Sequence, residues 1–249
     1  MRAVHPFVLA LGAWWLLARW DVLGNDFVLP GPRQVYERAR DLAADGTLAH
    51  ETGVTLGRVM LAFGLALVAG VALGALLGRS RRARPALRPV VSFLFPVPKV
   101  ALYPAMVIVL GLGSASKVAL GFAEALFPIL LATAAGTSRV DPRLVWSAAA
   151  LGTTRSTLPV KVVLPAALPA ILTGARIGLV GAIVGVFLGE MIVAADGLGH
   201  LMAASYRTLD TPAMYVAIVA VSLTGYLLDR GVLLARGRLL AWSDEEAAS

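Results

Sequence analysis

Residues 139–169, RVDPRLVWSAAALGTTRSTLPVKVVLPAALP, form a polar stretch between two segments that are hydrophobic enough to cross a membrane. The flanking segments are residues 118–135 and 177–195. When an apolar chain keeps one sizeable patch in water, that patch is a candidate surface for docking a partner. We call residues 139–169 the elbow and predict that it lies folded at the membrane surface.

The composition of the whole chain indicates a membrane protein. Of its 249 residues, 58% are hydrophobic and 15% are charged, and the mean hydropathy of +0.79 is well above that of an ordinary globular domain. A bilayer core of about 30 Å is crossed by roughly 20 helical residues. Segments of this kind cover residues 6–23, 59–78, 90–112, 118–135, 177–195 and 211–228. We therefore predict an all-α bundle of six transmembrane helices that forms one domain over residues 1–249.

The distribution of positive charge predicts the orientation of the bundle. Most lysines and arginines fall on the amino-terminal tail, residues 79–89, the elbow and the tail after Arg230. The densest cluster consists of Arg79, Arg81, Arg82, Arg84 and Arg88. Because cytoplasmic loops carry an excess of positive charge, both termini are predicted to be cytoplasmic in a multi-pass protein of the cell membrane. The net charge of +7 then reflects topology and lipid contact, and nucleic-acid binding is not expected.

Several kinds of chemistry find no support in the sequence. The chain has no cysteine, and His5, His50 and His200 stand far apart, so neither a metal site nor a thiol nucleophile is expected. No Gly-rich phosphate-binding loop followed by Lys and Ser or Thr occurs. We predict no cofactor and no enzymatic activity. The first apolar segment lacks a small-residue cleavage site before Arg19, which favours a retained helix over a removed signal peptide.

Local signals predict two short amphipathic or surface elements. Residues 30–53 follow a Pro-Gly-Pro turn and are expected to form one amphipathic helix on the outer surface. Its less polar side carries Val35, Ala39, Leu42 and Ala43. In the elbow, Asp141 is a candidate N-cap, Pro142 suits the first helical position and Gly152 marks the end of a helix of two to three turns. A second helical segment, residues 155–164, precedes Pro165 and Pro169, giving a helix–turn–helix.

The elbow resembles a known signature. In the inner-membrane permease subunits of binding-protein-dependent ABC importers, a cytoplasmic loop reads Glu-Ala-Ala, three residues, Gly, nine residues, an aliphatic residue, any residue, Leu and Pro. Here Gly152 is followed by nine residues and then by Val162, Val163, Leu164 and Pro165. Trp146 stands at the family's Glu and Ser147 at its first Ala, so this half of the signature departs from the pattern.

Longer phrases carry the resemblance across residues 29 to about 235. They are LPGPRQVYE, TLGRVMLAFGLALVAGVALG, PVVSFLFPVPKVALYPAMVIVLGLG, VVLPAALPAILTGARIGL and EMIVAADGLGHLM. These phrases look like the branch that imports sulfonates, taurine, nitrate or bicarbonate, and vitamin precursors. The resemblance implies a core permease region at residues 54–235 that includes the elbow.

The same resemblance implies a mechanism and a set of partners. The permease would be a passive gate for a small solute. Two copies, or one copy and a close paralogue, would form the pathway in the bilayer. A cytoplasmic ABC ATPase dimer would dock on the elbow, and an extracytoplasmic solute-binding protein would deliver the cargo. The implied coupling residues are Leu144, Trp146, Ser147, Ala148, Leu151, Gly152, Val162, Leu164 and Pro165. An indole at Trp146 can anchor by packing in place of the polar contact of a Glu.

Glycines and charges inside the predicted spans allow two interpretations each. Gly181, Gly185 and Gly189 recur every four residues, which favours static helix packing over a position along the pathway. Glu124 and Glu190 are either part of a polar pathway or gate, or buried partners of Lys99, Arg58 or a hydroxyl. Lys99 could attract an anion or extend to the inner face.

Two other classes of protein compete with this interpretation. An ion-coupled secondary transporter would place carboxylates and broken helices at mid-membrane. The only candidates for these features in the sequence are Glu124 and the proline-rich segment 90–112. It would also show internal repeats, and none is evident. An intramembrane enzyme would need a catalytic constellation that the sequence lacks.

Overall fold

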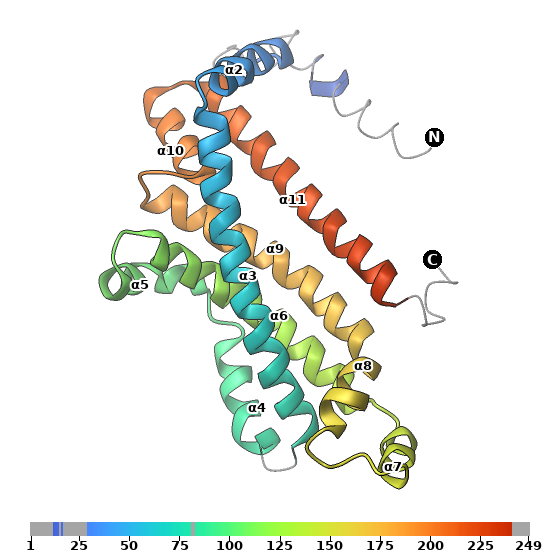
Figure 1. Cartoon of the computed structure of the whole chain (residues 1–249). Helices are drawn as coiled ribbons and strands as arrows, with labels where there is room; N and C mark the ends of the chain where they lie inside the picture. The colour runs from blue at the N-terminus through green and yellow to red at the C-terminus, as the bar shows by residue number, and fades with distance from the viewer. Residues whose placement is uncertain (1–11, 15, 17–28, 81–82, 241–249) are drawn as a thin grey trace. The chain divides into compact units, whose positions relative to one another are not determined.

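The computed structural model describes residues 12–14, 16, 29–80 and 83–240, and within these ranges it contains helices and no strand (Figure 1). The α-helices are α2 (Pro32–Ala44), α3 (Thr47–Arg79), α4 (Ala83–Leu94), α5 (Tyr103–Leu110), α6 (Ser114–Ser138), α7 (Pro142–Ala150), α8 (Leu164–Ala166), α9 (Leu168–Ile192), α10 (Leu198–Thr208) and α11 (Thr211–Leu239). A 3₁₀ turn, η1, covers Lys99–Leu102, and a π-helical turn, η2, covers Pro159–Val163. The predicted all-α class is confirmed for this part of the chain.

Four of the described helices, α3, α6, α9 and α11, are long and apolar enough to cross a membrane. They contain most of the predicted spans 59–78, 118–135, 177–195 and 211–228. Two of them extend well beyond the prediction, because α3 begins at Thr47 and α11 continues to Leu239. Charged residues at the ends of the predicted spans therefore do not end the helices.

The segment 90–112 is not the single helix that its hydrophobicity predicts. α4 ends at Leu94, and helical structure resumes only at η1, after Pro96 and Pro98. A proline has no N–H to donate and restricts the residue before it, so two prolines in this spacing interrupt a helix. The predicted span 6–23 lies almost entirely outside the described residues, as do Arg81 and Arg82.

The chain divides into two compact units, the first made of residues 1–57 and 187–224. In this unit α2 packs its apolar side, including Val35 and Leu42, against Ala213 and Val216 near the start of α11. Only part of the predicted helix 30–53 is correct: α2 ends at Ala44, and the positive φ of 82° at Gly46 separates it from α3. Ala43, expected on the less polar side, is exposed.

The second unit consists of residues 58–186 and 225–249, and within it α6 contacts both α3 and α9. Its core is formed mostly by alanines and β-branched residues of α3, α6 and α9, together with one leucine: Val59, Ala62, Ala66, Val118, Ala125, Ile129, Leu179, Ala182 and Val186. Glycines bring the helices close. A methyl group on Gly74 of α3 would lie 2.5 Å from the Leu130 carbonyl oxygen of α6, and one on Gly178 of α9 would lie 2.7 Å from Ile129. Close backbone contact of this kind is the usual use of small residues every four positions in membrane helices.

Candidate functional site

The first limb of the elbow is α7, and both of its ends are capped. The Asp141 carboxylate accepts a hydrogen bond from the Arg143 backbone N–H at 2.8 Å, which confirms the predicted N-cap. At the other end Gly152 has φ of +87°, its N–H donates to the Ala149 carbonyl, and the Thr153 N–H donates to the Ala148 carbonyl. This is a Schellman motif, whose left-handed position favours glycine. The helix predicted between Asp141 and Gly152 is therefore present and has defined ends.

The second limb of the elbow returns to the membrane helices through a series of short helical turns. The Leu158 N–H donates to the Thr154 carbonyl at 3.0 Å, and η2 and α8 follow before α9 begins. Pro165 and Pro169 each stand at the second position of their helix, where no intrahelical N–H is required. The predicted second helix over residues 155–164 is only partly correct, because residues 155–157 form turns and the helical part consists of η2 followed by the separate short helix α8.

An apolar cluster on the inner side of the elbow fixes it to the second unit. Its buried members are Val140, Leu158, Val163, Ala167 and Ile171, and Val145 of α7 and Val71 of α3 pack against them. The elbow is thus continuous with the packing of α3 and α9. A displacement of α7 would be transmitted to those helices through these side chains, because a close-packed core has few voids to absorb it.

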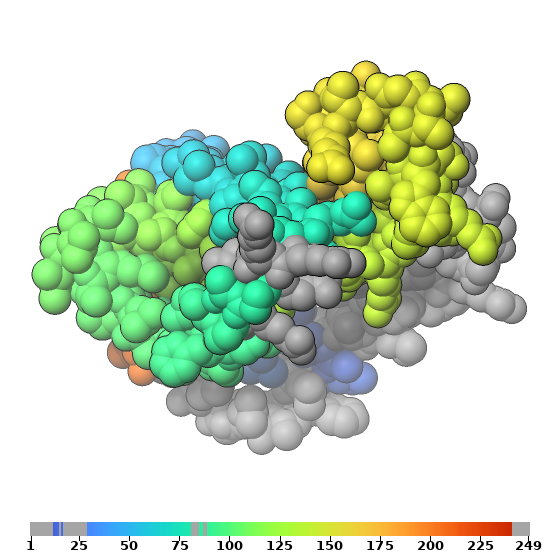
Figure 2. Space-filling model, turned by 90° about the horizontal axis from the view of Figure 1, so that it is seen from below, coloured from blue at the N-terminus to red at the C-terminus, as the bar shows by residue number. Residues whose placement is uncertain are grey.

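The opposite side of α7 presents large apolar side chains to solvent. The residue exposures are 52% for Leu144, 69% for Trp146 and 87% for Leu151. Figure 2 shows the elbow, in yellow, projecting from the rest of the second unit. Three large exposed apolar residues within eight positions of one capped element form a surface that a partner can bury. We call these three residues the apolar face of the elbow.

The remaining predicted coupling residues divide between the surface and the interior. Ser147, Gly152 and Pro165 are exposed, whereas Ala148, Val162 and Leu164 are partly buried. Leu164 packs on the apolar cluster below α7. The signature therefore places together residues that face solvent and residues that hold the elbow in place.

The intramembrane charges that the sequence singled out have partners within the chain. The Lys99 ammonium lies 3.8 Å from the Glu124 carboxylate, donates to the Phe95 carbonyl at 3.1 Å, and lies 5.2 Å from the centre of the Phe127 ring. The pair joins η1 to α6. Carboxylate, carbonyl and aromatic ring together compensate an ammonium that is largely removed from water.

Glu190 is 1% exposed and belongs to a hydrogen-bond network in the first unit. Its Oε2 accepts from the Thr55 hydroxyl at 2.8 Å and from the Gly199 N–H at 3.1 Å. The Thr55 hydroxyl in turn accepts from the Leu198 N–H at 2.8 Å, and the Gly197 N–H donates to Glu51. The carboxylate therefore joins α3, the end of α9 and the start of α10, as the alternative of a hydroxyl partner anticipated.

The glycines proposed for the pathway lie in packed positions. A methyl group on Gly181 would lie 2.9 Å from the Glu124 carbonyl oxygen, and one on Gly185 would lie 2.8 Å from the Gly121 Cα, so both glycines contact α6. Gly189 is buried in α9. These contacts favour the packing interpretation for Gly181 and Gly185.

Sequence reasoning missed an ion pair between two of the membrane helices. Arg176 of α9 donates to Asp229 of α11 through Nε at 2.6 Å and through a terminal nitrogen at 2.9 Å. Both residues fell just outside the predicted spans 177–195 and 211–228, whose limits were placed to exclude charge. The pair could have been predicted because helical apolar sequence continues beyond Arg176 and beyond Asp229. Two opposite charges inside long apolar helices each need a partner.

Comparisons with known proteins identify the family and the fold. Residues 66–238 match the sequence family described as the inner membrane component of binding-protein-dependent transport systems. A probable ABC transporter permease protein of Brucella abortus is 33% identical over 96% of this chain and 94% of its own length. The taurine transport system permease protein of Escherichia coli is 32% identical over 98% and 90%. A solved inward-facing structure of the MetNI methionine ABC transporter covers 73% of this chain and 94% of the compared chain, with a TM-score of 0.58 at 20% identity, and so shares the fold.

Proposed function

We propose that the elbow is the surface on which a separate ATPase subunit docks. The proposal proceeds from the family: the chain belongs to the inner-membrane components of binding-protein-dependent transport systems and is a multi-pass permease subunit of an ABC importer. The observation that carries the proposal is the apolar face of the elbow, Leu144, Trp146 and Leu151, on a helix capped at both ends. ATP-driven closure of an ATPase pair would move this helix, and the apolar cluster beneath it would pass the motion to α3 and α9.

The proposal extends to the arrangement in the membrane. Six spans, with both termini in the cytoplasm, fit the excess of positive charge on the elbow side and the four long apolar helices. The segment 6–23 would supply one further span, and the broken segment 90–112 would supply the other. We regard residues 1–249 as one permease domain with its core at residues 54–235.

The proposed assembly is a pair of permeases, either two copies of this chain or one copy with a paralogue. An ATPase dimer lies on the cytoplasmic side, and a solute-binding protein delivers cargo on the other. The taurine relative and the resemblance to importers of sulfonates, nitrate and vitamin precursors support a small solute of one of these types. Lys99, Glu124 and Gly189 remain candidate pathway or gate residues, whereas the contacts of Gly181 and Gly185 with α6 and the hydrogen bonds of Glu190 support a packing role for these three.

Docking is tested by recovery of an ATPase with the permease. Affinity-tagged permease is purified from native membranes, and the amount of co-purified P-loop ATPase is quantified for wild type and for Trp146→Ala. Because a buried aromatic anchor contributes about 2 kcal/mol or more, the complex should weaken by roughly 30-fold. Tyr36→Ala is the matched control, since Tyr36 is an equally exposed aromatic residue on α2, outside the elbow.

The energy source is tested by solute uptake in cells that express the permease. An importer of this kind stops when ATP is depleted and continues when the ion gradient is collapsed. Uptake with the opposite dependence, together with no recovered ATPase, would contradict the proposal and favour an ion-coupled secondary transporter. Equal recovery of ATPase with Trp146→Ala and wild type would show that the indole is not an anchor.

A further inference from the structure

One side of α9 is exposed along its length in the second unit. The exposed residues are Thr173, Arg176, Ile177, Val180 and Val184, and the residues between them are buried or half-buried. Their spacing of one, three or four positions puts them on one face of the helix. At about 1.5 Å per residue this face is about 16 Å long, which is roughly half the thickness of a bilayer core. We call these five residues the α9 face.

The α9 face carries an ion pair that joins two helices long enough to cross a membrane. Arg176 binds the Asp229 carboxylate of α11 through two nitrogens, yet 47% of the Arg176 side chain and 25% of the Asp229 side chain stay exposed. Next to Asp229, the exposed Arg230 donates to the Tyr226 hydroxyl at 3.0 Å. Charged side chains within membrane helices are unfavourable in lipid and face protein or a water-filled space. The charges on this side of α9 and α11 therefore disfavour contact with lipid.

Another exposed face of the same unit has the opposite character. A groove of about 890 Å³ lies between α3 and α6, and Leu61, Leu65 and Val68 of α3 are at least half exposed along it. Among the described residues that line this groove none is charged, and only Ser114 has a polar side chain. A surface without charge suits the acyl chains of lipids. Both faces expose large aliphatic side chains, and the ion pair is what distinguishes them.

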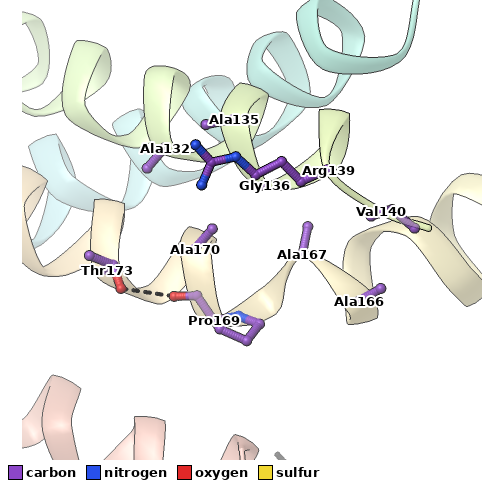
Figure 3. A pocket seen from close by; sticks show the side chains of 10 residues that line it. All are labelled: Ala132, Ala135, Gly136, Arg139, Val140, Ala166, Ala167, Pro169, Ala170 and Thr173. Atoms are coloured by element: carbon purple, nitrogen blue, oxygen red, sulfur yellow. Dashed lines mark hydrogen bonds between the residues drawn. The ribbon is translucent and has the colours of Figure 1, made fainter. Parts of the chain in front are cut away.

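The α9 face begins at a cavity of about 400 Å³, lined largely by alanines, at the elbow end of the helix (Figure 3). Ala132 and Arg139 line it from the side of α6, and Ala170 and Thr173 line it from α9. The Thr173 hydroxyl donates to the Pro169 carbonyl at 2.9 Å, within its own helix. Because Thr173 belongs to both, the cavity and the α9 face form one continuous surface that is hollowed at its elbow end.

We propose that the α9 face lines the water-accessible pathway of the cargo, with the Arg176–Asp229 pair in its wall. The inference rests on the proposed function as an importer permease and adds residues to its pathway that the sequence did not indicate. In such a wall the exposed part of the ion pair stays in contact with water. Ile177, Val180 and Val184 offer a polar solute no hydrogen-bond partner that would retain it, as passage requires. The groove between α3 and α6 then faces lipid.

The chain has no cysteine, so a single introduced cysteine reports the surroundings of one position. Ile177→Cys, Val180→Cys and Val184→Cys probe the α9 face. Leu65→Cys and Val68→Cys are the matched controls, because these aliphatic residues of the α3–α6 groove are about equally or more exposed. The complete importer in unsealed native membranes is treated with a charged, membrane-impermeant methanethiosulfonate, and the remaining free thiol is quantified over time.

The three α9 positions should react at least about 10-fold faster than both α3 positions, because the thiolate is the reactive form and needs water to ionise. Their rates should also change when ATP and vanadate arrest the ATPase, since a pathway opens and closes during transport. The rates at Leu65→Cys and Val68→Cys should not change.

Four results would overturn the inference. Equal rates at the α9 and α3 positions would mean that both faces contact lipid, and reaction at Ile177→Cys alone would place the ion pair at the level of the lipid headgroups. Disulfide-linked permease dimers through Val180→Cys, in place of reaction with the reagent, would assign the α9 face to contact with a second copy. Rates that ignore ATP and vanadate would indicate a static crevice. The comparison without ATP needs no ATPase, so its failure is distinct from a failure of ATPase co-purification, which concerns the proposed function.

Discussion

Replacing Glu190 by alanine should destabilise the first unit strongly. The carboxylate is almost completely buried and accepts hydrogen bonds from the Thr55 hydroxyl and the Gly199 N–H. Leaving a buried donor without its partner costs about 1–3 kcal/mol, and removing a buried charge recovers part of its desolvation cost. For two donors we expect a net loss of about 2–4 kcal/mol in the free energy of unfolding.

The loss is measured by reversible denaturant titration of the detergent-solubilised protein, together with hydrogen–deuterium exchange. Exchange should accelerate around residues 197–201, because the Gly199 N–H loses its acceptor and the Thr55 hydroxyl, which accepts from the Leu198 N–H, loses its own. Glu190→Gln keeps an oxygen acceptor and should lose about half as much. Glu37→Ala is the control, since Glu37 is 55% exposed in its side chain and its ion pair with Arg33 lies on the surface.

The reasoning about this network would be refuted by a specific result. If Glu190→Ala unfolds within about 0.5 kcal/mol of wild type, as surface substitutions do, the carboxylate does not stabilise the junction of α3, α9 and α10. Unchanged exchange at residues 197–201 would lead to the same conclusion.

Three further predictions concern residues at the ends of helices. Gly197 has a φ of +101°, and in Gly197→Ala the added methyl group would lie against the Glu190 carboxylate. The free energy of unfolding should therefore fall by at least as much as in Glu190→Ala, and wild-type stability would contradict this. Gly152→Ala should lower the free energy of unfolding by about 1–2 kcal/mol, because Gly152 adopts a left-handed conformation at the end of α7. It should also reduce ATPase recovery while membrane insertion is unchanged, and normal recovery would mean that this cap does not support docking. The Thr47 N–H, which donates to the Asp45 carboxylate, lowers the pKa of Asp45. The stabilisation by Asp45 is therefore present at neutral pH and lost as pH falls through that lowered pKa, so the difference between wild type and Asp45→Ala in denaturant titrations should shrink on acidification; a constant difference would contradict it.

Sequence reasoning succeeded where the signal is local. α7 was predicted from Asp141 to Gly152 because capping residues act on backbone groups within a few positions of themselves. The four long apolar helices were found because the hydrophobicity of a span is a property of consecutive residues. The same local rule failed at 90–112, where hydrophobicity predicted a span but Pro96 and Pro98 interrupt the helix.

The sequence by itself therefore determined the membrane class, the long apolar helices, the capped helix of the elbow and the family. Only the tertiary structure decided which groups meet. Glu190 binds Thr55, which lies 135 positions away, and Arg176 binds Asp229 across 53 positions. The tertiary structure also directs Gly181 and Gly185 towards α6 and places Arg139 beside an alanine-lined cavity. These outcomes depend on how each helix is rotated about its axis and on where it crosses its neighbour, and close packing sets both by the fit of many side chains at once.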